Sequence, residues 1–595
     1  MMKKFHLRFL LFLVLIGGLS SAFAELDTTR YIPVSEITTD MDAYCLTVLE
    51  GIEIEKFPLK ILSIVHNEEP GRDRILVIGT DERFKHVGSV HGCSGSPVYI
   101  DGRMAGALSA GWDGSIDPLY LVTPIEDMLR IREVQQQDNT RPIQFEADYL
   151  MEPEKFAKRF YQRLEQSRSL SKTTVPLIFS TPEIPGFDTY GTLKKMGLFP
   201  VFSSGFMEAG SASLGADQDQ IAPGGVLASP ICMGDINLAA VGTATEVVGN
   251  RVYAFGHSFM GTGSIELPMS AGWVHTVVAG RDTSFKFATA GPVLGTLRRD
   301  QASGVMGLID GGPRMIPVTL HLERTDMPQS RDFKYRIAVD ETLTAPVFQL
   351  ALLSAANLYS EAPLENSLRY SVKIRVKNHS PIEFSNVTTG TGFIPPATEI
   401  FSVVGLLMTN PFEKVDIESV NISLRLEAKS REAEFWQVQL SDTTVKPGDT
   451  MEASVTLLTY RQEKATCTIP IKIPNDLAPD TYTVTLMSHN DYLSHIRKTS
   501  LHRFSPEDVE SMIGMINELL NYQRNRLVAV LSLPPGGMAL RQEELPDLPA
   551  SRMALLQDPR RFLPISPIQH WLEFPQTLPL VPRGNLTIDL TVEQP

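Results

Sequence analysis

Short apolar runs separated by turn residues dominate the chain up to about Arg132. Apolar and polar positions alternate within these runs, as is typical of half-buried β-strands. The pattern predicts strands at Lys60–Val65, Arg74–Ile78, Val98–Ile100 and Met104–Leu108. The run Thr123-Pro124-Ile125-Glu126 then has the residue types that begin a helix, which we expect to continue to about Arg132. Residues 25–132 are therefore predicted to form a β-barrel unit.

The next two regions differ from each other in periodicity. Residues 133–220 begin with a polar stretch, and Phe156, Phe160 and Leu164 then recur at helical spacing, so that this region is predicted to be a helical linker whose apolar stripe contacts a core. Residues 221–325 return to strand patterning and predict a second β-barrel unit. Its expected strands are Val226–Cys232, Ala239–Glu246, Arg251–Phe255 and Met315–Leu320.

Longer alternating strands characterise residues 330–500, with examples at Tyr370–Val376, Val420–Leu426 and Tyr482–Met487. Together with the turn Lys446-Pro447-Gly448-Asp449, they predict an immunoglobulin-like β-sandwich. Residues 501–595 are expected to form a helix and then an extended, proline-rich tail, which ends in a strand at Leu586–Val592.

The first 24 residues have the features of a secretory signal peptide. Lys3, Lys4 and Arg8 precede the apolar run Phe9–Ile16, and Ala22-Phe23-Ala24 supplies small residues at the cleavage position. No later apolar run approaches the roughly 20 residues of a membrane-spanning helix. We expect an exported chain, periplasmic or secreted, without a transmembrane segment after cleavage. An uncleaved signal anchor is the alternative.

Charge and cysteine content restrict the class of partner and cofactor. The 595-residue chain has a formal net charge of −15, and the leader contains only basic charged residues, so nucleic acid is excluded as a partner. The four cysteines, Cys45, Cys93, Cys232 and Cys467, are too widely spaced for a zinc site. Cys45 and Cys93 are predicted to form either a disulfide or two buried free thiols.

The candidate chemistry begins at Gly92-Cys93-Ser94-Gly95-Ser96-Pro97. This hexapeptide has the G-x-S-G-x-P pattern of trypsin-like serine peptidases, in which glycines allow a tight turn that exposes the serine hydroxyl. The amides of Gly92 and Ser94 would form the oxyanion hole. An ordinary turn between two strands is the alternative interpretation. The catalytic interpretation requires a histidine base and an orienting group elsewhere in the chain.

His257 is the best candidate for that base. It follows an apolar strand and Gly256, so that its ring can emerge from a barrel wall. His86 and His91 lie too close to Ser94 in the chain to fold back onto it. His275 is second choice and fits an ordinary strand position.

These segments resemble the SpoIVB-type serine peptidase family. The resemblance lies in Gly88–Leu108, in Gly242-Thr243 with Ala254–His257, and in Gly295–Gly307. It implies a nucleophile at Ser94 and a general base at His257. The family aspartate lies in a Thr-Asp pair shortly before the serine, which corresponds here to Asp81. Asp101 is the alternative acid, although Asp101-Gly102 is a typical hairpin turn.

Two departures from the family are evident. The histidine segment follows the serine segment here, whereas in the family it precedes it, and no PDZ module is recognisable. The predicted fold is therefore mainly β: a trypsin-like two-barrel peptidase unit with halves in swapped order, an immunoglobulin-like sandwich and a helical or extended C-terminal tail. A triad depends on geometry rather than chain order.

The sequence predicts an exported serine endopeptidase that acts on a protein or peptide substrate and requires no metal or cofactor. Envelope signalling or self-processing would suit the family. The alternative is a non-catalytic envelope protein that keeps the peptidase fold as a binding or scaffold module.

Overall fold

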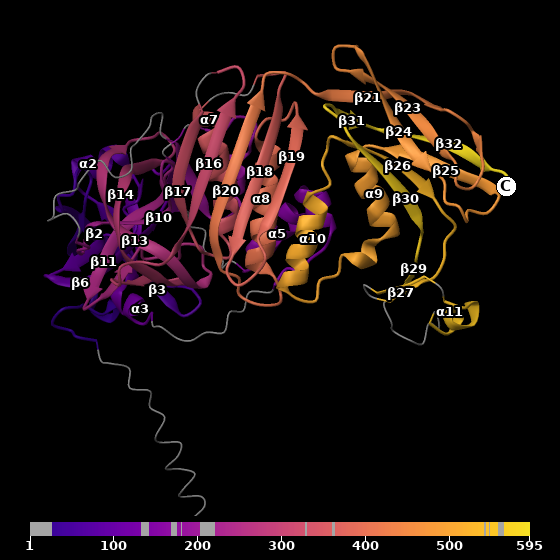
Figure 1. Ribbon diagram of the computed structural model, residues 1–595. Coiled ribbons are helices and arrows are strands. Elements are labelled where there is room, and N and C mark those ends of the chain that lie inside the picture. Colours follow the sequence, from indigo (N-terminus) through magenta and orange to yellow (C-terminus); the bar gives the residue numbers. More distant parts are fainter. Residues whose placement is uncertain are drawn as a thin grey trace, which may run out of the picture.

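The computed structural model describes residues 26–112, 114–131, 142–167, 175–179, 181, 183–202, 220–327, 330–359, 363–540, 543–546, 548–556 and 565–594. The predicted signal peptide and the first part of the predicted linker lie outside these residues. The first barrel, the second sheet and a C-terminal sandwich follow one another along the molecule in chain order, coloured indigo, magenta to orange, and orange to yellow (Figure 1). The predicted mainly-β fold is confirmed.

Six strands close into the first barrel, in the order β1-β2-β3-β7-β6-β5. Their bounds are β1 Asp42–Thr47, β2 Glu55–Glu69, β3 Arg72–Gly79, β5 Pro97–Ile100, β6 Arg103–Gly111 and β7 Leu119–Pro124. Alternate apolar residues fill the barrel: Phe57, Ile61 and Val77 are fully buried. All four strands predicted here are confirmed.

Short elements connect and flank this barrel. A 3-10 turn, Val34–Glu36, precedes β1. Helix α2 (Glu82–Val87) and the short strand β4 (Val90–His91) lead from β3 to the Ser94 loop. Helix α3 (Ile125–Leu129) follows β7, close to where the capping pattern predicted it.

A second ring of strands adjoins the first barrel. Strands β10, β13, β14, β15, β12 and β11 pair in that order, and an additional β10–β11 pairing closes the ring. Their bounds are β10 Val226–Gly234, β11 Leu238–Val248, β12 Arg251–Ala254, β13 Gly263–Val278, β14 Ser284–Gln301 and β15 Gly304–Leu308. Strand β4 of the first unit pairs in parallel with β14, so the two units share a seam beside the Ser94 loop.

The same sheet extends beyond the second ring on both sides. Strands β8 (Val175–Phe179) and β9 (Leu198–Phe202) join it at β11, from the region predicted to be a helical linker. That region also contains α4 Asp148–Met151, α5 Pro153–Ser167 and α6 Thr189–Lys195. On the other side lie β17, β16, β20, β18 and β19. These are β16 Met315–Arg324, β17 Arg331–Ala338, β18 Ser367–Val376, β19 Ile382–Thr389 and β20 Ile417–Glu427.

Two apolar helices, α7 (Thr344–Tyr359) and α8 (Ile394–Thr409), pack against each other within the same core. The aromatic rings of Phe156 and Phe160 on α5 pack against Phe401 on α8, with centroids 5.6 Å and 5.3 Å apart. Phe156, Phe160 and Leu164 are all buried, which confirms that the helical stripe is core contact.

The C-terminal sandwich begins near residue 432, and residues 330–427 extend the preceding sheet instead. One layer is β24-β23-β21-β31 and the other is β22-β32-β25-β26-β30. Their bounds are β21 Glu432–Leu440, β22 Thr444–Val445, β23 Thr450–Thr459, β24 Lys464–Lys472, β25 Asp480–Met487, β26 Arg526–Ser532, β30 Trp571–Thr577, β31 Val581–Arg583 and β32 Asn585–Val592. The predicted tail thus contributes four strands to the sandwich, because β-strands with one buried face need partners wherever the chain supplies them.

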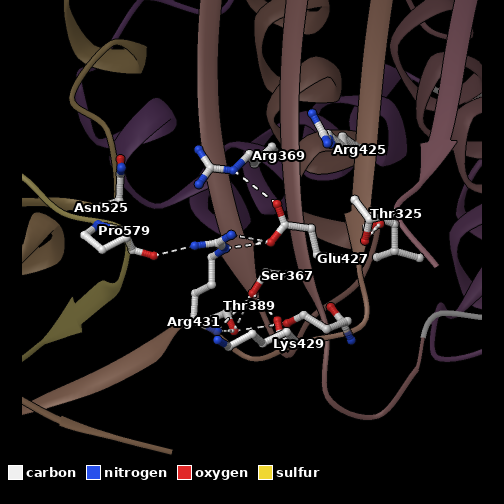
Figure 2. Close-up of polar contacts among 12 residues, drawn as sticks. Thr325, Ser367, Arg369, Thr389, Arg425, Glu427, Lys429, Arg431, Asn525 and Pro579 are labelled. Carbon is white, nitrogen blue, oxygen red and sulfur yellow. Dashed lines mark hydrogen bonds and ion pairs between the residues drawn. The ribbon is translucent and has the colours of Figure 1, made fainter. Parts of the chain in front are cut away.

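Smaller elements complete the C-terminal part: α9 His489–Thr499, a 3-10 turn Leu501–Arg503, α10 Val509–Leu520, α11 Ala550–Leu556, and a small sheet of β27 Met538–Leu540, β28 Glu543–Leu545 and β29 Ile565–Pro567. Polar contacts fix the sandwich to the end of β20 (Figure 2). Arg431 forms an ion pair with Glu427 at 2.6 Å and donates to the Pro579 carbonyl at 2.7 Å. These contacts link β20 to the chain just before β31.

Candidate active site

The Ser94 loop is a tight turn between β4 and β5. Gly92 and Gly95 both have φ of +96°, which only glycine adopts without strain. The amides of Cys93, Gly95 and Ser96 donate to the carbonyls of Val90, Leu108 and Cys93. The Ser94 side chain is partly exposed, and neither its hydroxyl nor its amide has a hydrogen-bond partner among the described residues. Both groups are therefore available to a substrate.

The loop packs directly on β11 of the second ring. The amide of Thr243 donates to the Ser94 carbonyl at 2.9 Å, and the Thr245 hydroxyl donates to the Gly95 carbonyl at 2.7 Å. A Cβ at Gly95 would lie 1.9 Å from the Thr243 carbonyl oxygen. Glycine is therefore required there by the close approach of the two units as well as by its φ.

His257 is held near the same seam. Phe255 and Gly256 both have positive φ, +67° and +69°, and turn the chain sharply at the end of β12. The Thr123 hydroxyl of the first barrel donates to the Gly256 carbonyl at 2.5 Å, and the Phe255 amide donates to the Thr243 carbonyl at 3.4 Å. The Ser94 and His257 segments, far apart in sequence, thus both lie against Thr243.

The contacts of His257 define its tautomer. Nδ1 lies 2.7 Å from the Ser258 carbonyl oxygen. A carbonyl can only accept, so Nδ1 carries the proton and Nε2 carries the lone pair. Burial lowers the pKa of His257 to about 4; the Ser258 hydrogen bond opposes this shift, and the charges of His91 and Arg74 add to it. The imidazole is neutral at pH 7 and can accept a proton.

A buried carboxylate holds the loop that follows His257. Asp300 is 1 % exposed and accepts the amides of Phe259 and Met260 at 2.6 Å and 2.7 Å. It also accepts the amides of Gly261 and Thr262, at 2.7 Å and 3.3 Å. Burial raises the pKa of Asp300 to about 6, against the effect of these four hydrogen bonds. Asp300 therefore fixes the backbone that supplies the Ser258 carbonyl.

The structure places Asp81 at the N-terminus of α2. Its Oδ1 accepts the Arg83 amide at 2.8 Å, and the Arg83 guanidinium lies 3.4 Å away. Among the described residues, the hydrogen-bond partner of His257 Nδ1 is the Ser258 carbonyl and not Asp81. Asp101 lies in an exposed turn between β5 and β6 with φ of +49°. The acid role of Asp81 stays a prediction.

The remaining candidates have structural positions. His275 Nε2 bonds the Thr289 hydroxyl at 2.7 Å across an exposed pair of strands. Cys45 and Cys93 are buried free thiols, as one of the two alternatives predicted. Sequence reasoning assigned no role to Asp300, although it lies within one of the segments that carried the family resemblance, because nothing in the sequence around it marks its long-range contacts.

Two six-stranded rings meet at a seam where the loops of Ser94 and His257 both approach β11. This arrangement is consistent with a β-barrel peptidase fold. Residues 16–112 match the family described as SpoIVB peptidase S55. This segment contains the first barrel up to β6 and the Ser94 loop, and the match confirms the predicted family for it. His257 lies outside the matched residues. Searches of curated proteins and of solved structures found no match. In the described residues no helix is long and apolar enough to span a membrane.

Proposed function

We propose that the protein is an exported serine endopeptidase of the SpoIVB type that cleaves a protein or peptide substrate. The observation that carries this proposal is the pairing of two loops on Thr243. One loop presents the Ser94 hydroxyl and amide without partners, and the other presents a histidine whose Nε2 is unprotonated. The family match to the serine-bearing segment supports the same chemistry.

In the proposed mechanism, Ser94 Oγ attacks the peptide carbonyl while His257 Nε2 takes its proton. The oxyanion forms beside the amides of Ser94 and Gly92. His257 then returns the proton to the leaving amine, and a water molecule hydrolyses the acyl-enzyme by the same steps. No metal or cofactor takes part.

The group that orients His257 has two candidates. In this conformation the Ser258 carbonyl accepts the Nδ1 proton, and Asp300 holds that carbonyl in place. The carboxylate predicted from the family resemblance is Asp81, which would have to replace the Ser258 carbonyl at Nδ1. We retain Asp81 as the alternative, because a carboxylate stabilises an imidazolium better than a carbonyl does.

A non-catalytic binding module is the second candidate function. It is favoured by the low pKa of His257, since a weak base activates a serine poorly. A role in envelope signalling or self-processing belongs to the first candidate and follows from the family alone.

Labelling with a serine-reactive fluorophosphonate tests the proposal. Residues 25–595 should be labelled, and Ser94→Ala should abolish labelling with an unchanged melting temperature. Ser96→Ala is the matched control in the same loop and should still be labelled, at a lower rate. A Ser94→Ala protein that is labelled like wild type would place the nucleophile elsewhere, and an unlabelled wild type would favour the binding module.

A further inference from the structure

A lysine lies fully buried beneath the Ser94 loop. Lys286 comes from β14 of the second ring, and its exposed fraction is 0 %. Its aliphatic stem packs under Gly92, where a Cβ would lie 3.1 Å from Lys286 Cβ. Among the described residues no carboxylate lies within ion-pair distance of its amine. A buried amine without a counter-charge is costly, so its position calls for an explanation.

The amine donates to two threonine hydroxyls that lead to the loop. Lys286 Nζ lies 2.8 Å from Thr47 Oγ1 and 3.1 Å from Thr243 Oγ1. Thr243 in turn donates to the Gly92 carbonyl at 2.9 Å. This first arm fixes the orientation of the Gly92–Cys93 peptide.

The second arm passes through Ser96. Its hydroxyl lies 2.6 Å from the Cys93 carbonyl and 2.9 Å from the Thr47 hydroxyl. A carbonyl can only accept, so the single proton of Ser96 goes to Cys93, and the Thr47 hydroxyl supplies the proton between Thr47 and Ser96. The donors therefore run from Lys286 through Thr47 and Ser96 to the Cys93 carbonyl.

The end of this second arm is the peptide that contains the Ser94 amide. A hydrogen bond to a peptide carbonyl withdraws electron density from its N–H and makes that N–H a stronger donor, and bonds in a chain strengthen one another. The Ser94 amide has no hydrogen-bond partner among the described residues. We infer that Lys286 is a positioning residue whose second hydrogen-bonded arm fixes and polarises the Cys93–Ser94 peptide, which supplies one of the two proposed donors of the oxyanion hole. The inference rests on the proposed function only for its catalytic consequence.

The sequence offers a direct readout, because Cys93-Ser94 is its only Cys-Ser pair. Protein carrying carbonyl-¹³C cysteine and ¹⁵N serine in a deuterated background therefore gives one carbonyl-to-amide NMR signal, that of the Ser94 amide. Lys286→Met keeps the stem and removes the amine, and Ser96→Ala interrupts the second arm. Both should move the Ser94 ¹⁵N and Cys93 ¹³C signals upfield.

Thr245→Val is the matched control. Thr245 is a buried β11 residue whose hydroxyl donates to the Gly95 carbonyl of the same loop. Among the described residues the hydrogen bonds of Lys286 Nζ go to Thr47 and Thr243 and not to Thr245. Thr245→Val should leave the Ser94 signal close to its wild-type position. The second arm is a single chain of hydrogen bonds from Lys286 to Cys93. The double variant Lys286→Met/Ser96→Ala should therefore shift the Ser94 signal little further than Ser96→Ala alone. If Lys286→Met shifts the Ser94 signal no more than Thr245→Val does, the inference is overturned. If Lys286→Met does not fold, a Ser94 signal that is unshifted in Ser96→Ala overturns it.

Labelling adds the catalytic consequence. Loss of a whole oxyanion donor costs roughly 100-fold or more, so weakening one should slow fluorophosphonate labelling about tenfold in Lys286→Met and in Ser96→Ala. If wild-type protein is not labelled but Lys286→Met still shifts the Ser94 NMR signal, the peptidase proposal is overturned. The same result would support the polarised Cys93–Ser94 peptide. Labelling of Lys286→Met at the wild-type rate would contradict the catalytic consequence.

Discussion

The two loops of the candidate site are held by buried ionisable groups of opposite type, the amine of Lys286 and the carboxyl group of Asp300. Beneath the Ser94 loop, the Lys286 amine donates to side-chain hydroxyls, which pass hydrogen bonds to two carbonyls. Beneath the His257 loop, the Asp300 carboxylate accepts four backbone amides directly. Among the described residues neither the Lys286 amine nor the Asp300 carboxyl group has an ion-pair partner. In the proposed mechanism, the Lys286 amine makes the Ser94 N–H a stronger hydrogen-bond donor. The Asp300 carboxylate instead positions the Ser258 carbonyl.

The largest expected effect is on the base itself. His257→Gln should lower the rate of Ser94 labelling by roughly a thousandfold or more, because the proposed mechanism assigns the hydroxyl proton to His257 Nε2. Urea unfolding of the same sample checks that the protein remains folded. Labelling within tenfold of wild type would remove His257 from the mechanism.

The next largest expected effect is a difference in unfolding free energy between variants of the two buried groups, Asp300 and Lys286. Asp300→Ala leaves four amides without an acceptor, two buried and two part-buried, and should cost several kcal/mol of unfolding free energy, at about 1–3 kcal/mol for each buried unsatisfied group. Lys286→Met should be neutral or stabilising, since an apolar side chain replaces a buried amine whose pKa is lowered by burial and which has no carboxylate partner among the described residues. Urea unfolding of both variants measures the contrast. Equal destabilisation would mean that the lysine is a structural anchor like the aspartate.

His257 and Asp300, both buried, should contribute oppositely to the pH dependence of stability. The folded-state pKa of His257 is lowered to about 4, so its contribution to stability is lost as pH falls from about 6.5 to 4. The folded-state pKa of Asp300 is raised to about 6, so its contribution is lost as pH rises from about 4 to 6. Each shift corresponds to about 3 kcal/mol, and the two slopes have opposite signs.

Wild-type stability should therefore vary little through these two groups between about pH 4 and 6. His257→Gln should become less stable as pH rises through that window, and Asp300→Asn should become less stable as pH falls. Denaturant titrations at several pH values measure both slopes. Parallel slopes in the two variants would mean that one of the two pKa directions is wrong.

Asp81→Asn is expected to have the smallest effect. Asparagine can still cap α2 by accepting the Arg83 amide, so stability should change by less than about 1 kcal/mol. The contacts of His257 predict labelling within severalfold of wild type. The labelling rate of Asp81→Asn could instead fall by orders of magnitude while its stability is unchanged and Asp101→Asn is labelled at the wild-type rate. That result would make Asp81 the acid.

Much of the local structure could be predicted from the sequence. Four of the six strands of the first ring and three of the six strands of the second follow from periodicity, as does the buried stripe on α5. The two loops of the candidate site follow from glycine placement. The boundary of the C-terminal sandwich could not, because β18 and β20 alternate in the same way as strands of a sandwich. Only the pairing of β20 with β16 assigns them to the preceding sheet.

The residues beneath the loops are harder to predict for a related reason. Lys286 and Asp300 are single charged residues in strands, and each acts on a loop that is distant in the sequence. Their burial depends on the pairing of β4 with β14 and on the packing of β11 against the Ser94 loop. Local patterns specify a strand and its faces, but the partner of a buried charge is fixed only when the two units meet.

The most direct test of the central claim is the pH profile of Ser94 labelling. If the buried, neutral His257 is the base, the labelling rate of wild-type protein should fall at low pH with a midpoint near 4, where the imidazole gains a proton. His257→Gln should show a low rate without this inflection. A midpoint near the ordinary histidine value of about 6.5, or a His257→Gln profile that coincides with wild type, would contradict the account.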